Sequence, residues 1–462
     1  MRIMNGSGRW RRVLAAAGLT LAVSAGTTAT AAAATPPAHD PGAFGFGNND
    51  YRQLGHGTSV DDRQLGHVTG LPVSVTQLAA GGNASAALLP DGTVWTWGEG
   101  YPDGSSRSPA PVPGLTGITQ VAVSQDGNAF FAVGPGGRVW AWGRNFYGQL
   151  GDGSTADHLA PAPVPGLDGV TRVSAGPHDT LAVRADGTAW AWGANDYGEL
   201  GDGTTTSRLT PRQVRGLSGV TQVSAGADYT VAVRADGTVW EWGLSGNGEL
   251  DGSANKKAHL TPEQVPGLSG VSQVATDGFH TLALRSDGAV LAWGENSSGE
   301  IGDGTFTART SPVQLSLTGV ILVAAGPAES AAVRSDGTLL TWGDNALGGL
   351  DLPCCATESP TPAPAAGLTW VTQAAFGYDY GLALSTVPAG TVAVPDVTYE
   401  TQAQASQALR AAGLFLGGVT TRADLTCDNI GLVLSQRPAA GAYASRGTSV
   451  SITIGKLPPK CF

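Results

Sequence analysis

The sequence predicts an all-β fold: a seven-bladed β-propeller closed by an N-terminal strand, followed by a small α+β (β-α-β-β) C-terminal domain. The main observation is a W-x-W-G segment whose second aromatic residue recurs with gaps of 51, 45, 50, 50, 51 and 49 residues. A fixed period near fifty residues indicates a repeat architecture, in which each copy is one structural unit. The seven aromatic residues are Phe46, Trp97, Trp142, Trp192, Trp242, Trp293 and Trp342.

The copy around residues 186–201 shows how one unit is built. Residues 170–176 and 180–184 have the pattern of short strands, and Asp186-Gly187 leads into the W-x-W-G strand. An Asp-Gly pair between alternating segments is a strong hairpin signal, because both turn residues tolerate a positive φ. We expect about four short antiparallel strands per copy, with the tryptophans as core residues between neighbouring sheets.

The last copy is incomplete, and the first residues of the repeat region supply what it lacks. Residues 370–377 and 381–384 have the pattern of two strands, but no W-x-W-G segment follows them. An aromatic version of that segment stands at residues 44–47. We therefore expect the N-terminal strand to complete the last blade, which leaves no open sheet edge. The propeller is expected over residues 43–384.

The N-terminus has the composition of an export signal. Four arginines precede an apolar run at residues 13–23, and small residues follow at 28–34. We expect a signal peptide over 1–34 and a linker over 35–42, and hence a secreted, extracellular or cell-wall-associated protein. A membrane anchor is the alternative, but the apolar run is too short to span a bilayer comfortably.

Charge and cysteine content limit the class of partner. Removing residues 1–34 leaves 22 basic residues against 37 acidic ones, a net charge of −15, which argues against nucleic acid as a partner. The four cysteines are Cys354, Cys355, Cys427 and Cys461. An even count in an exported chain favours disulfides, and we prefer Cys427–Cys461, leaving Cys354 and Cys355 unassigned.

The sequence pattern changes after a linker at residues 385–391, and we expect a second domain over 392–462. Thr401 followed by Gln404 is a capping-box pattern, and Gly413 is expected to end the helix that it starts. Alanine and leucine fall at helical spacing between them. Two strands are expected at residues 431–436 and 449–454.

Both parts of the chain resemble known families. The W-x-W-G, N-x-x-G-x-L-G, S-A-G and D-G elements over residues 44–384 resemble the regulator-of-chromosome-condensation repeat family, whose members are seven-bladed propellers. Copy two departs from this pattern at Gln125-Asp126-Gly127 and copy six at residues 350–355. The motifs V-P-D-V, L-R-A-A-G-L and R-G-T-S-V-S-I-T-I-G within residues 391–455 resemble the PASTA domain, which implies extracytoplasmic location and contact with peptidoglycan.

Candidate binding residues lie where the repeats differ. The turns after each A-G element vary, while the strands beside them barely change, and loops on a rigid scaffold are a usual place for recognition. The partner-binding candidates are His178, Asp179, Asp228, Tyr229, Phe279, His280, Glu329, Tyr378, Asp379 and Tyr380. The aspartates of the G-D-G-T turns are expected to form turn hydrogen bonds; calcium binding is the less favoured alternative.

No catalytic motif is present among those searched, which include H-E-x-x-H, G-x-S-x-G and Gly-rich phosphate loops. We therefore expect a non-enzymatic, monomeric binding protein that uses no cofactor or metal and that takes an extracellular protein partner and peptidoglycan or a muropeptide. The family resemblance adds an inhibitor of β-lactamase or of penicillin-binding proteins as a special case. The alternative is a cell-wall-acting carbohydrate enzyme that uses the turn carboxylates Asp179, Asp228, Glu329 and Asp379.

Overall fold

The structure is a computed structural model of the chain. It describes residues 42–59, 62–72, 74–99, 107–245, 257–345, 358–365, 368–386, 390–424, 429–438 and 443–457. The expected signal peptide and all four cysteines, and so the expected Cys427–Cys461 disulfide, lie outside these residues. Within them, no helix is long and apolar enough to cross a membrane.

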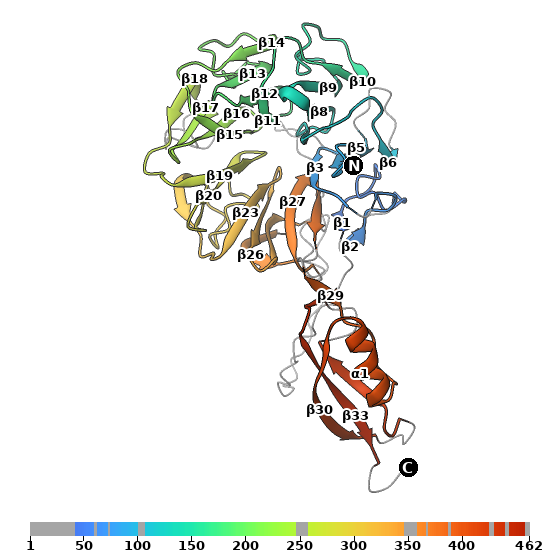
Figure 1. Cartoon of the computed structure of the whole chain (residues 1–462). Helices are drawn as coiled ribbons and strands as arrows, with labels where there is room; N and C mark the ends of the chain where they lie inside the picture. The colour runs from blue at the N-terminus through green and yellow to red at the C-terminus, as the bar shows by residue number, and fades with distance from the viewer. Residues whose placement is uncertain are drawn as a thin grey trace, which may run out of the picture. The chain divides into compact units, whose positions relative to one another are not determined.

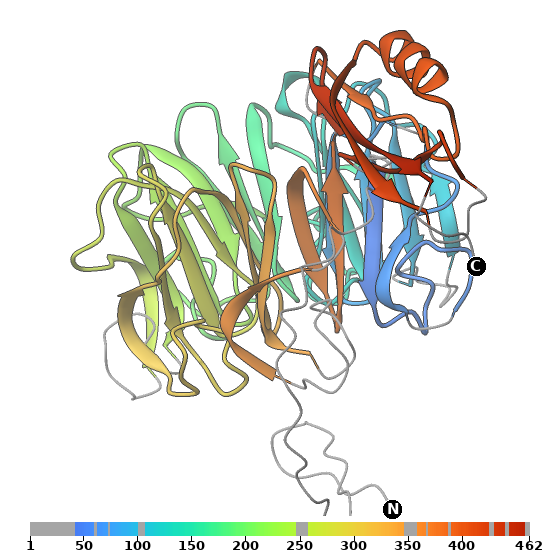
Figure 2. The same ribbon diagram turned by 90° about the horizontal axis from the view of Figure 1, so that it is seen from below.

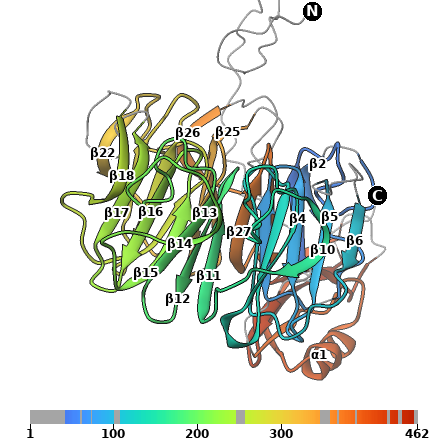
Figure 3. The ribbon, with the colours of Figure 1, turned by 90° about the horizontal axis from the view of Figure 1, so that it is seen from above.

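Seven four-stranded antiparallel sheets form a ring, which Figure 1 shows along its axis. Figure 2 and Figure 3 show the same strands from the side, running between the two faces of the ring. The strands of blade one are β3 (Gln77–Gly81), β4 (Ala84–Leu88), β5 (Val94–Gly98) and β6 (Arg107–Pro111). Those of blade two are β7 (Gln120–Val123), β8 (Ala129–Val133), β9 (Val139–Gly143) and β10 (His158–Pro163), with the 3-10 turn η1 (Pro135–Gly137).

The next four blades repeat the same order. Blade three has β11 (Val170–Ala175), β12 (Asp179–Arg184), β13 (Ala189–Gly193) and β14 (Arg208–Gln213). Blade four has β15 (Val220–Ala225), β16 (Tyr229–Arg234), β17 (Val239–Ser245) and β18 (Lys257–Gln264). Blade five has β19 (Val271–Thr276), β20 (His280–Arg285), β21 (Val290–Gly294) and β22 (Arg309–Gln314). Blade six has β23 (Val320–Ala325), β24 (Glu329–Arg334), β25 (Leu339–Asp344) and β26 (Glu358–Pro364).

Blade seven is built from both ends of the repeat region, as the sequence predicts. Its strands lie in the order β2 (Asp62–His67), β1 (Gly42–Gly47), β28 (Tyr380–Ser385) and β27 (Val371–Gly377). β1 pairs with β28 in continuous antiparallel register, from Gly42 opposite Ser385 to Gly47 opposite Tyr380. The expectation that the first strand completes the last sheet is confirmed.

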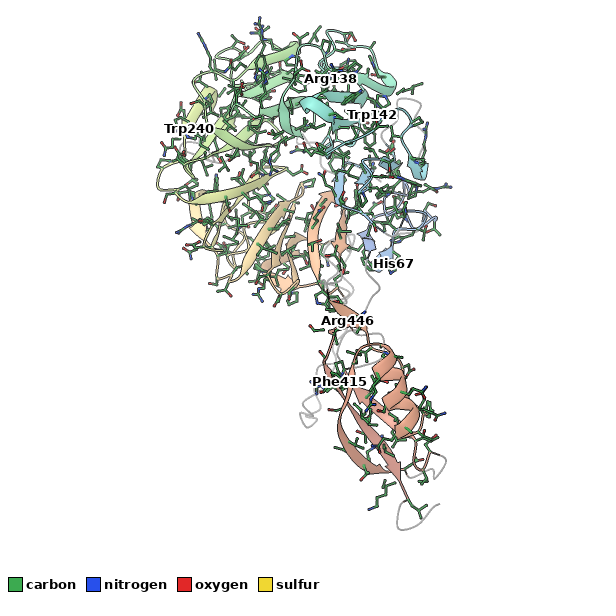
Figure 4. The ribbon with its side chains drawn as sticks, in the orientation of Figure 1. His67, Arg138, Trp142, Trp240, Phe415 and Arg446 are labelled. Atoms are coloured by element: carbon green, nitrogen blue, oxygen red, sulfur yellow. The ribbon has the colours of Figure 1, made fainter. Side chains whose placement is uncertain are left out.

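The tryptophans form the core between blades. The second aromatic side chain of each W-x-W-G segment is at most 1% exposed, and each packs with residues of two neighbouring sheets. Four of the indoles also bond a loop carbonyl of the preceding blade; Trp192 Nε1, for example, donates to the Gln149 carbonyl at 2.7 Å. The hydroxyl of Thr180 donates to the same carbonyl at 2.9 Å. The indole therefore supplies both apolar area and an oriented hydrogen bond. Figure 4 labels Trp142 of this set.

Glutamines on the innermost strands join neighbouring blades. The Gln77 amide donates to the Val121 carbonyl at 2.8 Å and accepts from the Val121 nitrogen at 3.0 Å. The same two-bond bridge recurs between blades two and three, four and five, and five and six. Gln373 joins blade seven to blade one in a similar way, through the Leu78 nitrogen and the Thr76 carbonyl, so ring closure uses a glutamine as four other blade junctions do.

The C-terminal unit contains one helix and two small sheets. Helix α1 (Gln402–Ala411) has Thr401 as N-cap, and its capping box with Gln404 is confirmed. The C-cap is Ala412, one position before the predicted Gly413, which follows it with φ +78°. β31 (Val433–Arg437) and β33 (Ser449–Lys456) match the expected strands.

Three further strands complete this unit: β29 (Thr391–Ala393) is the strand expected before the helix, whereas the sequence prediction missed β30 (Phe415–Ala423) and β32 (Tyr443–Ser445). β30 runs parallel to β33 at the edge of the three-stranded sheet, in the order β30-β33-β31. β29 pairs with β32 in a separate two-stranded sheet. The core of the unit includes Leu409 of the helix and Val433 of the sheet.

Candidate partner-binding site

The propeller has two faces of different chemistry. The tip face carries the turns between the first and second strands of each blade and the long loops between the third and fourth strands. The hairpin face carries the Asp-Gly turns; on it the backbone nitrogen of Val220 bonds the Gly187 carbonyl of the preceding blade. The seven tip turns contain six carboxylates and no lysine or arginine: Asp126, Asp179, Asp228, Asp277, Glu329 and Asp379. The tip face is therefore acidic around the ring axis.

Half of the predicted binding residues are not exposed on this face. The buried ones are Asp179, Tyr229, His280, Glu329 and Tyr380, none more than 4% exposed. Each is the first residue of the second strand of its blade and pairs with the glycine of W-x-W-G, as Tyr229 does with Gly243. These five candidates therefore do not project from the tip face, because the last residue of each turn already belongs to the sheet.

Three of the buried residues link adjacent blades. The Tyr380 hydroxyl donates to the Ala84 carbonyl at 2.6 Å in blade one. The Tyr229 hydroxyl lies 2.9 Å from the His280 carbonyl in blade five, and His280 Nε2 lies 2.8 Å from the Ser330 hydroxyl in blade six. Burial lowers the pKa of His280 to about 4, so its imidazole is neutral at physiological pH. These side chains have structural roles that the sequence pattern did not reveal.

The buried acids of this face resist ionisation. Burial, followed by the charges of Glu199 and Asp228, raises the pKa of Asp179 well above its usual range. Burial also raises the pKa of Glu199 to about 7, although its carboxylate accepts a 2.8 Å hydrogen bond from the Tyr197 nitrogen. The pKa of Glu329 is raised by burial and by Asp379. These carboxyl groups lie behind the surface rather than on it.

The remaining predicted residues do reach the surface. His178 and Tyr378 are exposed, and Asp228, Phe279 and Asp379 are half-buried. Burial raises the pKa of Tyr378 to about 12, with further contributions from the charges of Asp126 and Asp277. No finding tests whether these five residues contact a partner, and that role stays a prediction.

The structure shifts the turn of blade two. Ala129 pairs with Gly143, the position that Asp179 holds opposite Gly193 in blade three. Residues 127–129 are therefore equivalent to residues 177–179 of blade three. They lie two positions after the predicted Gln125-Asp126-Gly127. Asp126 stands where blade three has Gly176, and its carboxylate accepts bonds from the side chain and backbone of Asn128.

A hollow of about 370 Å³ lies on the tip face where blades two and three meet. Its wall contains the aromatic pair Phe146 and Tyr147, whose ring centroids are 5.1 Å apart and nearly perpendicular. The Tyr147 ring also lies 4.2 Å from the His178 ring of blade three. The other lining residues are Asp126, Asn128, Arg144, Gln149 and Asp157. The hollow thus combines aromatic surface with charged groups of both signs.

Phe146 is the feature that the sequence prediction missed. Its side chain is 77% exposed, the highest value among the large apolar residues that are exposed in the described part of the chain. The equivalent positions of three other blades hold polar residues, namely Asp50, Asp196 and Ser297. Alignment of the N-x-x-G-x-L-G loops would have singled it out, because the framework does not need an apolar side chain there.

The G-D-G-T aspartates form turns, as predicted. One carboxylate oxygen of Asp202 accepts bonds from the nitrogen and hydroxyl of Thr204, and the other accepts from Arg208 Nε at 2.8 Å. Asp303 repeats this arrangement with Thr305 and Arg309. Across the part of the chain that the structure describes, no group of three His, Cys, Asp or Glu side chains could hold a metal ion.

Comparison with known proteins agrees with this architecture. The RCC1-like domain family matches residues 11–269, and regulator of chromosome condensation (RCC1) repeats match 271–300 and 287–333. The PASTA domain family matches residues 392–456.

Curated relatives resemble only part of the chain. The ultraviolet-B receptor UVR8 of Arabidopsis thaliana is 31% identical over 286 residues, which cover 58% of this chain and 64% of the receptor. The human E3 ubiquitin-protein ligase HERC2 is 43% identical over 53 residues, 11% of this chain and 1% of the ligase. The chain therefore spans less than two thirds of the length of these relatives.

Solved structures share the fold at low identity. Prp20p of Saccharomyces cerevisiae superposes with a TM-score of 0.67 at 21% identity, covering 76% of this chain and 94% of Prp20p. Human WBSCR16 also has a TM-score of 0.67, at 20% identity, covering 76% of this chain and 100% of that protein. With seven four-stranded blades and a family match over more than half of its length, the chain belongs to the RCC1-like family of propellers and carries a PASTA domain at its C-terminus.

Proposed function

We propose that the protein is a secreted, non-enzymatic binding protein that holds a protein partner on the tip face of its propeller and contacts peptidoglycan through its PASTA domain. The observation that carries the proposal is Phe146, an exposed aromatic side chain beside a hollow that lies between two blades. An apolar side chain that the fold does not need, next to a hollow with oriented polar groups, is typical of a recognition site.

The sector of blades two and three has the residue types that dominate binding energy at protein interfaces. Arg144, Phe146 and Tyr147 lie together around the hollow, and aromatic residues and arginine are the most frequent hot-spot residues. Exposed tyrosines extend the aromatic surface to blade seven through Tyr51 and within blade three through Tyr197. A partner of ordinary interface size would cover several of these loops at once.

The hairpin face is a weaker candidate because its charged groups pair with one another. Arg285 lies 2.8 Å from Asp287, and Arg234 lies 3.2 Å from Asp236. The large apolar residue Ile321 is exposed near that face. The tip face instead carries the exposed aromatic residue Phe146 beside a hollow.

Burial disfavours the enzymatic alternative. The carboxyl groups with strongly raised pKa values, Asp179 and Glu329, are at most 4% exposed and lie behind the first residues of the turns. A polysaccharide could not reach them without opening the sheet. Raised pKa values in this fold follow from packing, so they do not by themselves indicate general acid catalysis. A β-lactamase or a penicillin-binding protein remains one class of partner within the proposed binding role.

The proposed location is supported by two independent parts of the chain. The N-terminus has the arginine-rich, apolar and small-residue order of an export signal. The C-terminal unit belongs to a family whose members bind peptidoglycan-related ligands, and its edge strand β30 exposes Phe415, which Figure 4 labels. An exposed aromatic side chain on this strand is a candidate contact for the wall.

The test is capture of partners from the secreted and wall fractions of the source organism. Immobilised mature protein is compared with the variants Phe146→Asp and Phe146→Ser, which introduce the residues that Asp196 and Ser297 provide in other blades. We expect one or more proteins to be retained by the wild type and lost from both variants, with Ile321→Thr as the control on the other face. Retention of every partner by both Phe146 variants would refute the proposed site.

A further inference from the structure

A second feature of the tip face is a cavity on the ring axis. It has a volume of about 310 Å³ and is lined by the innermost strands of all seven blades. Most of the lining consists of alanine, valine, serine and glutamine. Asp277, from the turn of blade five, is the only charged residue among the lining residues. The Asp277 carboxylate in this cavity therefore differs from the polar side chains that join neighbouring blades by hydrogen bonds.

Asp277 occupies this position without a structural need for it. Five other blades have glycine at the equivalent position: Gly81, Gly176, Gly226, Gly326 and Gly377. The Asp277 side chain is 8% exposed, and no hydrogen bond to its carboxylate is present among the described residues. Burial is the cause that raises its pKa well above the usual range. A buried carboxylate without a donor costs free energy, so a ligand that supplies a donor and a positive charge would be bound favourably.

The groups around Asp277 also favour a cation. Burial raises the pKa of Tyr378, a residue of the blade-seven turn, and the charges of Asp126 and Asp277 raise it further. The charge of Asp277 also contributes to the raised pKa of Glu329. Gln125 Nε2 donates to the Ala225 carbonyl, so its amide lies at the same level of the ring. The turns that surround the mouth contain neither lysine nor arginine, so the protein does not neutralise this charge there.

We propose that the mouth of the axial cavity binds a primary ammonium group, with Asp277 as its counter-charge, and that the group is the side chain of a lysine on the protein partner. An ammonium group offers three donors to a site made of acceptors. A divalent metal ion fits less well, since the described residues provide no set of three ligating side chains. The assignment to a partner lysine depends on the proposed function, whereas the affinity for an ammonium group does not.

The test uses n-butylammonium chloride and the peptide acetyl-Gly-Lys-Gly-amide as probes of the mature protein. NMR would follow the side-chain amide of Gln125 and the backbone amide of Gly278 during titration. We expect saturable shifts of both signals with each probe, and none with sodium chloride at equal ionic strength or with the peptide acetylated on its lysine.

Two substitutions and one control connect the shifts with Asp277. Asp277→Asn removes the charge with little change of shape, and Asp277→Gly introduces the residue of the other blades. Both variants should lose saturable binding, while Asp186→Asn on the hairpin face should keep it. Shifts with butylammonium but not with the lysine peptide would support the ammonium site and indicate a free amine as its ligand.

The proposal is overturned by three results: no saturable shift with either probe, equal shifts with sodium, or unchanged binding in both Asp277 variants. None of these outcomes bears on Phe146, which lies at the hollow between blades two and three and is absent from the lining of the axial cavity. Failure of the ammonium site can therefore be told apart from failure of the proposed partner-binding site.

Discussion

The amide oxygen of Gln373 accepts a hydrogen bond from the backbone nitrogen of Leu78, 3.0 Å away, and so joins the last blade to the first. The amide nitrogen of Gln373 completes the bridge at the Thr76 carbonyl, 2.6 Å away. The contact spans 295 residues and resembles the bridge that Gln222 makes between blades four and five, where both bonds go to one residue, Val274. Ring closure therefore uses an interaction found inside the ring.

Closure of the ring by Gln373 predicts that two substitutions lower the free energy of unfolding by equal amounts. Gln373→Ala and Gln222→Ala each remove two hydrogen bonds and leave a partner nitrogen without its acceptor. Each should lower the free energy of unfolding by about 1–3 kcal/mol, measured by urea denaturation. If Gln222→Ala is costly but Gln373→Ala is neutral, blades seven and one are not joined in solution.

Glu199 predicts a pH-dependent stability difference. Its folded-state pKa of about 7 exceeds the ordinary value of 4.5, so the unfolded chain loses this proton first as the pH rises. The free energy of unfolding therefore falls between about pH 4.5 and pH 7, by on the order of 3 kcal/mol for this group alone. Glu199→Gln introduces the residue found at Gln149, which makes the same bond to its loop, and should remove that loss.

The measurement for Glu199 is urea unfolding of wild type and Glu199→Gln at pH 4 and pH 8. We expect the two proteins to differ little at pH 4 and the variant to be more stable at pH 8. The reverse substitution, Gln149→Glu, is the matched control and should destabilise the protein at pH 8. An equal difference between wild type and Glu199→Gln at both pH values would contradict the raised pKa.

Tyr229 and Phe146 should separate stability from binding. Tyr229→Phe removes a buried hydroxyl that interacts with Thr276, His280 and Thr281, and should cost about 1–3 kcal/mol of unfolding free energy. Phe146→Asp should change stability by less than about 0.5 kcal/mol, because its side chain is exposed. Phe146→Asp should reduce partner capture more than Tyr229→Phe does. Thermal unfolding and capture on the same two variants provide the check, and coincident losses would contradict the assignment.

The sequence predicted the blades and their closure because both depend on local patterns. Period, Asp-Gly turns and W-x-W-G segments were sufficient to locate the sheets and, at 44–47, the strand that completes the last one. The burial of Tyr229 and Tyr380 was not predicted, because it arises from contact with the next blade rather than from the turn itself. β30 was missed because Gly417 and Gly418 interrupt its apolar pattern.

The proposed contact between the PASTA domain and peptidoglycan predicts that the protein is retained on the cell wall. Full-length mature protein should sediment with purified peptidoglycan, and removal of residues 391–462 should reduce the sedimented fraction to background. Phe415→Ser in the full-length chain should weaken retention, because it removes the exposed aromatic side chain of β30 without disturbing the core. Thr420→Ser on the same strand is a conservative control. Unchanged sedimentation of the truncated protein would remove the proposed wall contact.

The central proposal, a protein partner on the tip face of blades two and three, is tested most directly by photo-crosslinking. p-Benzoylphenylalanine is placed at residue 146 or at residue 321 of the mature protein, which is then irradiated in the secreted and wall fractions. The account predicts a covalent adduct with a defined protein from position 146 and none from position 321. An adduct from position 321 alone, or from neither position, would contradict it.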